Sequence, residues 1–148
     1  MDWWPYFALF GVAFAAATLL PAQSELVLGA MLATGRYDAG ILLAVATAGN
    51  VIGSLANWTI GCFLRRYRDR RWFPVPKGGL DRAERIYRRW GVWTLLLSWV
   101  PVVGDPLTLV AGILKTPLRI FLPLVFAAKL GRYLVVAGVV SLVATAAP

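Results

Sequence analysis

Charged residues are rare in the apolar parts of this 148-residue sequence, and four of them stand where hydrocarbon is expected: Glu25, Asp105, Lys129 and Arg132. A charge inside a membrane segment is costly unless it is paired, neutralised or placed in a wet cavity, so such residues commonly mark transport pathways. Because burial disfavours the ionised form, the two carboxyls are candidates for proton exchange. A guanidinium binds carboxylate or phosphate through paired hydrogen bonds. The four residues therefore form a candidate substrate and proton site.

The two acids follow a proline at the same spacing, Pro21 before Glu25 and Pro101 before Asp105. One interpretation is that both belong to a shared polar site. Another is that they cap short helices at the membrane rim, because Gly104-Asp105-Pro106 has the form of a cap followed by a first-turn proline. Their equivalent positions favour the shared site.

Lys129 and Arg132 are three residues apart and so share a helix face. A tilted helix would let both reach the cytoplasmic surface. Arg132 nevertheless lies about 14 residues beyond Leu118, which is roughly 20 Å of helix. We therefore expect Arg132 to be the counter-ion of Glu25 or Asp105, or to bind an anionic headgroup, with Lys129 as the weaker candidate.

The composition is that of an integral membrane protein. Hydrophobic residues make up 59% of the chain, and the stretches 3–24 and 39–64 contain no charged residue. Both exceed the roughly 20 apolar residues that a helix needs to cross a bilayer. The single cysteine, Cys62, and the absence of histidine exclude a disulfide framework and the usual ligands of zinc or haem. We expect no metal, no cofactor and no enzymatic activity.

A basic loop at residues 65–89 carries +7 of the net charge of +8. A short basic loop between apolar segments is the signature of a cytoplasmic loop, and it argues for anionic lipid headgroups and against nucleic acid as partners. The residues that we expect at the membrane surface are Arg65, Arg66, Arg68, Arg85, Arg88 and Arg89.

The end of this loop, Leu80–Trp90, has the pattern of an amphipathic helix. Its predicted apolar face comprises Leu80, Ala83, Tyr87 and Trp90. Acid-before-base pairs at i, i+4 join Asp81 to Arg85 and Glu84 to Arg88. Such a helix lies on a membrane surface, with binding to a partner protein as the alternative.

The chain is predicted to form a single all-α membrane domain over residues 1–148. Its parts are a first helix at 1–20, a hairpin plus helix at 21–64, the basic loop with its amphipathic helix at 65–90, and a second hairpin plus helix at 91–148. Residues 21–35 are too short and too polar to span, and 91–114 is broken at 101–106 with Lys115 and Arg119 holding its far end at the cytoplasmic side. Each stretch is therefore expected to be a re-entrant hairpin. The prediction is three spanning helices and two opposed hairpins.

The two halves also match each other in sequence. With two extra residues allowed after Asp105, the matched pairs are 19–25 with 99–105, 28–34 with 110–116, and 49–50 with 131–132. Inverted repeats with broken helices are a transporter design whose site lies at the repeat interface. Chance similarity between apolar segments is the alternative.

Gly49 and Gly53 form a small-residue face for close helix packing, and Asn50 can donate a hydrogen bond across it. The sequence Gly49-Asn50-Val51-Ile52-Gly53, with Trp58 and Gly61 after the first hairpin, resembles the DedA superfamily, also called the VTT or SNARE-associated domain. Residues 91–93 and 98–107, which include Gly104-Asp105-Pro106-Leu107, are similar to its small YqaA-like branch.

This resemblance covers about residues 18–135 and implies lipid translocation in a bacterial inner membrane. Members are described as flipping or scrambling phospholipids or undecaprenyl phosphate, often with proton coupling. Glu25 matches the family's hairpin acid. Arginines usually surround the second hairpin's proline, whereas Ser98 and Asp105 flank Pro101 here.

The expected function is therefore a flippase- or scramblase-like transporter of a phosphate-bearing lipid, with membrane lipids as partners and homo-oligomers as an option. Two alternatives remain. One is a small-solute or ion transporter on the same scaffold. The other is a non-transporting protein that organises the membrane through its basic loop.

Overall fold

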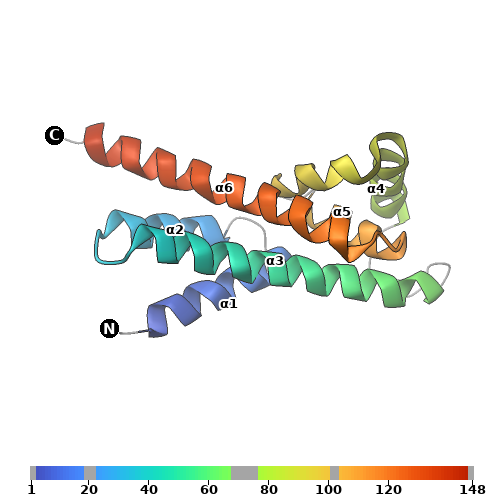
Figure 1. The fold of residues 1–148 in the computed structure, drawn as a ribbon, viewed down its shortest axis with the longest axis horizontal. Coiled ribbons are helices and arrows are strands. Elements are labelled where there is room, and N and C mark those ends of the chain that lie inside the picture. Colours follow the sequence, from blue (N-terminus) through green and yellow to red (C-terminus); the bar gives the residue numbers. More distant parts are fainter. Residues whose placement is uncertain (1–2, 19–22, 68–76, 101–103, 147–148) are drawn as a thin grey trace. The chain divides into compact units, whose positions relative to one another are not determined.

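The computed structural model describes residues 3–18, 23–67, 77–100 and 104–146, and within these ranges the chain is helical with no strand. Figure 1 shows the elements in chain order. They are α1 (Trp4–Thr18), α2 (Gln23–Ala33), α3 (Ala39–Leu64), the 3-10 helix η1 (Arg65–Tyr67), α4 (Lys77–Trp90), the 3-10 helix η2 (Gly91–Trp99), α5 (Gly104–Ile113) and α6 (Leu118–Ala146).

Two helices, α3 with 26 residues and α6 with 29, are long and apolar enough to cross a membrane. The first helix is also apolar, but α1 has 15 residues. That length corresponds to about 22 Å, short of the roughly 30 Å of a bilayer's hydrocarbon core. The all-helical class is confirmed, and the third spanning helix expected at residues 1–20 is not.

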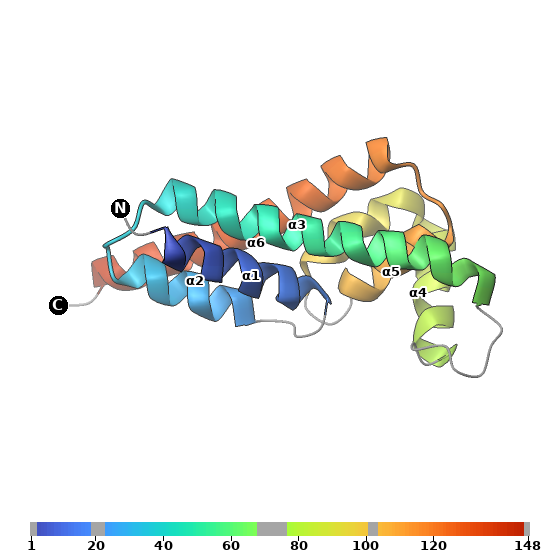
Figure 2. The same ribbon diagram turned by 90° about the horizontal axis from the view of Figure 1, so that it is seen from below.

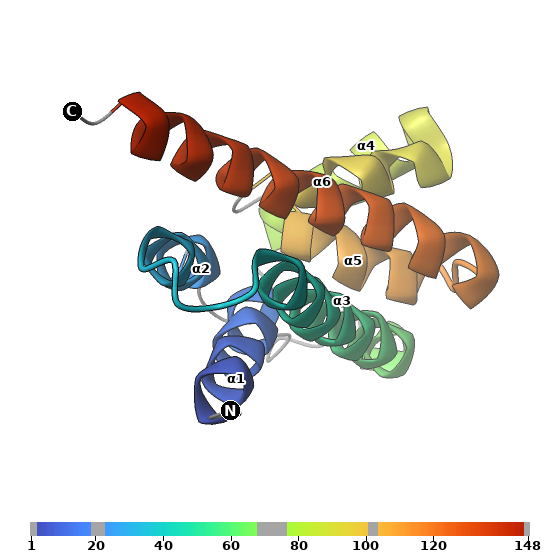
Figure 3. The same cartoon turned by 60° about the vertical axis from the view of Figure 1, so that its left-hand side comes forward.

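The chain divides into two compact units, one formed by residues 1–53 with 129–148 and the other by residues 54–128. In the first unit α1 and α2 run antiparallel beside each other (Figure 2) and lie along the first part of α3 (Figure 3). Their buried core consists of Tyr6, Leu9, Ala13, Leu28, Leu42, Ala46 and Tyr133.

This arrangement changes the expected first hairpin. Residues 21–35 were predicted to fold back on themselves, but their described part is the single helix α2 followed by a turn at Gly35. The antiparallel neighbour of α2 is α1 (Figure 2). Sequence reasoning assigned α1 to a separate span because the uncharged stretch from residue 3 to 24 is long enough for one.

The small-residue face of α3 packs directly on α1. A Cβ added at Gly49 would lie 2.6 Å from the carbonyl oxygen of Phe10, and one at Gly53 would lie 2.6 Å from that of Phe14. Real Cβ atoms do not approach other heavy atoms this closely, so both positions require glycine for the backbones to meet. The predicted packing role of Gly49 and Gly53 is confirmed.

In the second unit, α5 is the central element and packs against α4 and η2. Seven of its ten residues are buried. A side chain at Gly112 would collide with the backbone of Trp58, and one at Gly61 would collide with the backbone of Leu109. Gly104 likewise meets the carbonyl of Ser98, where η2 and α5 approach each other.

Each of the short helices α2 and α5 is followed, two residues after its last helical residue, by a residue in the left-handed conformation. Gly35 has φ 63° and Lys115 has φ 54°. At the end of α5 the Thr116 N–H donates to the Ala111 carbonyl at 2.9 Å and the Lys115 N–H donates to the Gly112 carbonyl at 2.9 Å, which is a Schellman motif. This cap directs the chain from α5 into α6.

The distance from acid to cap is the same in both helices. Gly35 comes ten residues after Glu25, and Lys115 comes ten residues after Asp105. The sequence comparison placed two extra residues after Asp105, whereas these two acid-to-cap distances are equal.

We predict that Gly49→Ala destabilises the protein by about 1–3 kcal/mol, because the added methyl group forces α1 and α3 apart. Gly11 on α1 has nothing within 4 Å of an added Cβ. The control variant Gly11→Ala should be neutral or stabilising by up to about 1 kcal/mol, since alanine is the better helix former. Unfolding in mixed micelles measures both, and equal shifts in one direction would contradict the contact.

Candidate functional site

Of the two carboxylates proposed as partners for Arg132, the structure places Glu25 against it. The Nε group of Arg132 on α6 forms an ion pair with Oε1 of Glu25 on α2. The two side chains are 13% and 17% exposed, so the pair is largely removed from its surroundings. Breaking such a pair by removing one partner is costly, because the other charge stays buried. The pair therefore fixes α2 against α6.

A hydrogen-bonded cluster lies beside the ion pair. The Asn50 side-chain amide donates to the Tyr133 hydroxyl at 2.9 Å, and that hydroxyl donates to the Ser24 hydroxyl at 3.0 Å. All three side chains are at most 2% exposed. Ser24 precedes Glu25 and Tyr133 follows Arg132, so the cluster joins α2, α3 and α6 next to both members of the ion pair.

Sequence reasoning identified Asn50 as a donor across helices but missed Ser24 and Tyr133. A serine and a tyrosine in apolar helices carry no charge and have no diagnostic spacing. The available signal was their position, because each is the chain neighbour of a residue already selected for its charge.

Buried side-chain oxygens near this cluster keep unused hydrogen-bonding capacity. Within the described part of the chain, Oδ1 of Asn50 and Oγ1 of Thr47 have no hydrogen-bond partner. They are one helical turn apart on α3. Buried polar atoms without partners are uncommon and often mark sites that bind water or ligand.

An apolar groove of about 360 Å³ starts at Glu25 and runs between α2 and α6. Glu25 is the charged residue among those that line it. The others are Leu26, Gly29, Ala30, Val135, Val136, Val139 and Val140. The groove thus joins a hydrocarbon-like lining to a charged end.

The remaining site candidates have mixed outcomes. Lys129 is 1% exposed and lies one turn before Arg132 on α6, on the same side as Tyr133. Asp105 lies in the first turn of α5, as the cap interpretation requires, and Glu25 lies in the first turn of α2. Pairing of Glu25 with Asp105 concerns both units and stays a prediction.

The prolines next to the two acids were also selected from the sequence. Pro106 is exposed in the first turn of α5, while Pro21 and Pro101 lie outside the described residues.

The predicted membrane-surface arginines are exposed where the structure describes them. Arg65 and Arg66 continue α3 in η1, and Arg85, Arg88 and Arg89 are on α4. Arg68 lies outside the described residues.

The predicted apolar face of α4 is only partly confirmed. Tyr87 is buried, and its hydroxyl forms a 2.5 Å hydrogen bond with the Thr116 hydroxyl. Burial raises the pKa of the Tyr87 phenol, and this hydrogen bond acts in the opposite direction. Trp90 is 65% exposed, so it does not share the buried face. The side chains of Leu80 and Ala83 are outside the described set.

Two helices long and apolar enough to cross a membrane, and an ion pair between α2 and α6 beside an apolar groove, are the pattern of a helical membrane protein. The family model of the VTT domain matches residues 4–142. The chain therefore belongs to the VTT-domain family of the DedA superfamily.

The chain is also similar to curated bacterial proteins. It is 42% identical over 128 residues to the Inner membrane protein YqaA of Escherichia coli, which covers 86% of this chain and 83% of that protein. The YqaA protein of Shigella flexneri gives the same values. An uncharacterized protein of Haemophilus influenzae is 37% identical over 135 residues, covering 84% and 80%. No solved structure matches the chain.

We predict that Tyr133→Phe lowers the free energy of unfolding by about 1–3 kcal/mol, because it leaves the buried Asn50 and Ser24 groups without their partner. The Tyr37 hydroxyl forms no hydrogen bond with the described residues, so Tyr37→Phe is the matched control and should shift stability by less than about 0.5 kcal/mol. Thermal unfolding in detergent compares the two. Equal losses would show that the cluster does not hold the helices.

Proposed function

We propose that this protein moves a phosphate-bearing lipid between the leaflets of the bacterial inner membrane, as a flippase- or scramblase-like transporter. The observation that carries the proposal is the ion pair of Glu25 and Arg132 at one end of an apolar groove. An amphiphile has the same division, with a charged head and a hydrocarbon chain. The inner-membrane location rests on the similarity to YqaA.

The proposed binding step is an exchange of partners at Arg132. The guanidinium is held by the Glu25 carboxylate, and a lipid phosphate competes for the same donors because it accepts paired hydrogen bonds in the same geometry. Lys129 lies one turn away and adds a second cation near the headgroup path. The chain of the lipid lies along the valines of α6 and the small residues of α2.

Protonation of Glu25 would couple this exchange to pH. A neutral carboxyl no longer holds Arg132 as an ion pair, so the guanidinium becomes available to phosphate. The polar groups shown next to Glu25 are Arg132 and Tyr133 on α6 and Ser24 on its own helix. None of the others is an acid, so Glu25 is the proposed proton carrier in this unit.

The proposed membrane arrangement uses α3 and α6 as spanning helices. The antiparallel pair of α1 and α2 and the pair of η2 and α5 would enter from opposite sides as re-entrant hairpins, related as an inverted repeat. The short length of α1 and the equal acid-to-cap distances support this arrangement. It replaces the third spanning helix with a hairpin arm.

The apolar lining of the groove favours a lipid over a small solute or ion, which would need more polar groups along its path. The exposed arginines of α4 are the observation that favours the other candidate function, a protein that organises the membrane without transport. Accelerated lipid movement in liposomes separates transport from organisation.

We predict that Arg132→Ala reduces flipping of a labelled phosphate-bearing lipid in proteoliposomes by roughly tenfold or more, because a charge-assisted contact to phosphate is lost. Arg132→Lys keeps the charge without the planar fork and should be intermediate. The control is Arg89→Ala on the exposed side of α4, which should retain the wild-type rate. Matched rates for Arg132→Ala and Arg89→Ala, at equal protein content, would exclude the exchange mechanism.

Glu25→Gln should remove the pH dependence of transport while sparing part of the rate, because a neutral side chain imitates the protonated state. The measurement is flip rate from pH 5 to pH 9, with thermal stability recorded alongside. If Glu25 is only a cap of α2, the variant will lose stability and keep its pH dependence.

A topology test uses one new cysteine. After Cys62→Ser, the variant Gly78→Cys should be labelled by an impermeant reagent only when the cytoplasmic face is opened, because the basic loop at 65–89 is cytoplasmic in the proposed arrangement. Labelling of this cysteine from outside intact cells would show that the loop faces the exterior, which would contradict the proposed topology.

A further inference from the structure

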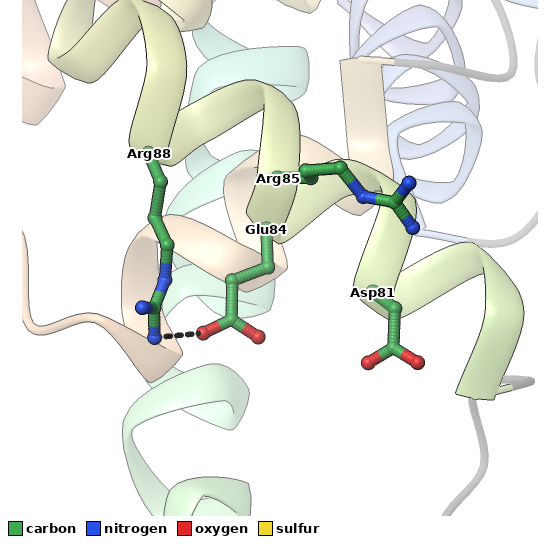
Figure 4. A pocket seen from close by; sticks show the side chains of 4 residues that line it. All are labelled: Asp81, Glu84, Arg85 and Arg88. Atoms are coloured by element: carbon green, nitrogen blue, oxygen red, sulfur yellow. Dashed lines mark hydrogen bonds and ion pairs between the residues drawn. The ribbon is translucent and has the colours of Figure 1, made fainter.

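A pocket on α4 has a charge composition unlike the rest of the basic loop. It measures about 380 Å³ and is lined by Asp81, Glu84, Arg85 and Arg88 (Figure 4). These positions fall at i, i+3, i+4 and i+7, so they share one face of the helix. Two acids and two arginines make the pocket neutral, within a loop that carries +7.

The four side chains place each acid next to an arginine. Glu84 is 6% exposed and accepts a 2.9 Å hydrogen bond from Arg88, whose side chain is 71% exposed. In Figure 4 the carboxylates of Asp81 and Glu84 point in the same direction. Arg88 lies beside Glu84, and the Arg85 side chain extends toward Asp81. Of the two predicted i, i+4 ion pairs, the structure shows the Glu84–Arg88 pair. A carboxylate and a guanidinium at Asp81 and Arg85 remain available to a ligand.

The exposed tryptophans at the end of α4 and after it in the chain favour a position near the lipid headgroups. Trp90, Trp93 and Trp99 are 65%, 68% and 47% exposed, and exposed tryptophans are typical of the membrane interface. The Arg89 guanidinium lies 5.9 Å from the Trp90 ring centroid, a cation–π contact that suits this zone. A headgroup is therefore the ligand within reach.

We propose that the pocket binds a zwitterionic headgroup that carries a primary ammonium and a phosphate, as in ethanolamine phospholipids. The ammonium has three N–H donors for the carboxylates of Asp81 and Glu84. The phosphate accepts from the guanidinium group of Arg85, while Arg88 stays paired with Glu84. A purely anionic headgroup would meet two carboxylates, and a choline headgroup has no N–H to donate. The pocket lies in the second unit, so this proposal does not depend on the Glu25–Arg132 site.

The test is native mass spectrometry of the purified full-length protein with ethanolamine, glycerol and choline phospholipids that share the same acyl chains. Wild-type protein should retain the ethanolamine lipid in preference to the other two. Asp81→Asn and Arg85→Gln should each lower that preference roughly three- to fivefold, as expected for one partly exposed charge contact. Asp81→Asn should also improve retention of the glycerol lipid.

Arg82→Gln is the matched control, because Arg82 is exposed on the same helix and does not line the pocket. It should leave the ethanolamine preference unchanged. Equal retention of the glycerol and ethanolamine lipids by wild-type protein would overturn the proposal. So would an equal loss with Arg82→Gln, since it would show a general attraction to the basic surface. Unchanged helicity by circular dichroism confirms that each variant is folded.

Discussion

The first unit depends on one requirement, which is that charges and hydroxyls placed in hydrocarbon must find partners within the protein. Glu25 finds Arg132, and the neighbours of both residues meet through the Tyr133 hydroxyl. Because the partners come from different helices, satisfying the polar groups also fixes the position of α2 against α6. The groove exists where these helices continue beyond the ion pair with small and apolar side chains. The same contacts thus hold the fold and form the candidate site.

The second unit meets the same requirement around one residue. Thr116 uses its hydroxyl with Tyr87 and accepts a hydrogen bond from the Trp58 indole at its carbonyl oxygen, at 3.1 Å. It stands directly after the left-handed cap of α5, so its position is set by the backbone as well as by its partners. Through Thr116 the surface helix α4 is connected with α3 and with the turn before α6. A displacement of α4 would therefore act on that turn.

The sequence was sufficient for the helical class, the close contact at Gly49 and Gly53, and the choice of Arg132 as a counter-ion, because each rests on a charge or a spacing. It was insufficient for the limits of the first hairpin. An uncharged stretch from residue 3 to 24 does not reveal that the chain turns back, since α1 is as apolar as a true span. It was also insufficient for Ser24 and Tyr133, because a hydroxyl's partner on another helix leaves no local pattern. The predicted place of Trp90 on the buried face of α4 was wrong for a third reason. An aromatic residue at an interface satisfies the amphipathic pattern whether it faces protein or lipid.

The contact between Gly61 and Gly112 has an evolutionary consequence. A side chain at either position meets the backbone of the opposite helix, so no substitution at one residue can be compensated by a change at the other. Pairs that tolerate compensation leave correlated changes in related sequences, and this pair is expected to leave none. A closest approach of two helices would thus be silent in covariation, while looser contacts nearby would produce the stronger signal. In such a protein the closest helix–helix contacts are the ones that covariation between related sequences is least able to locate.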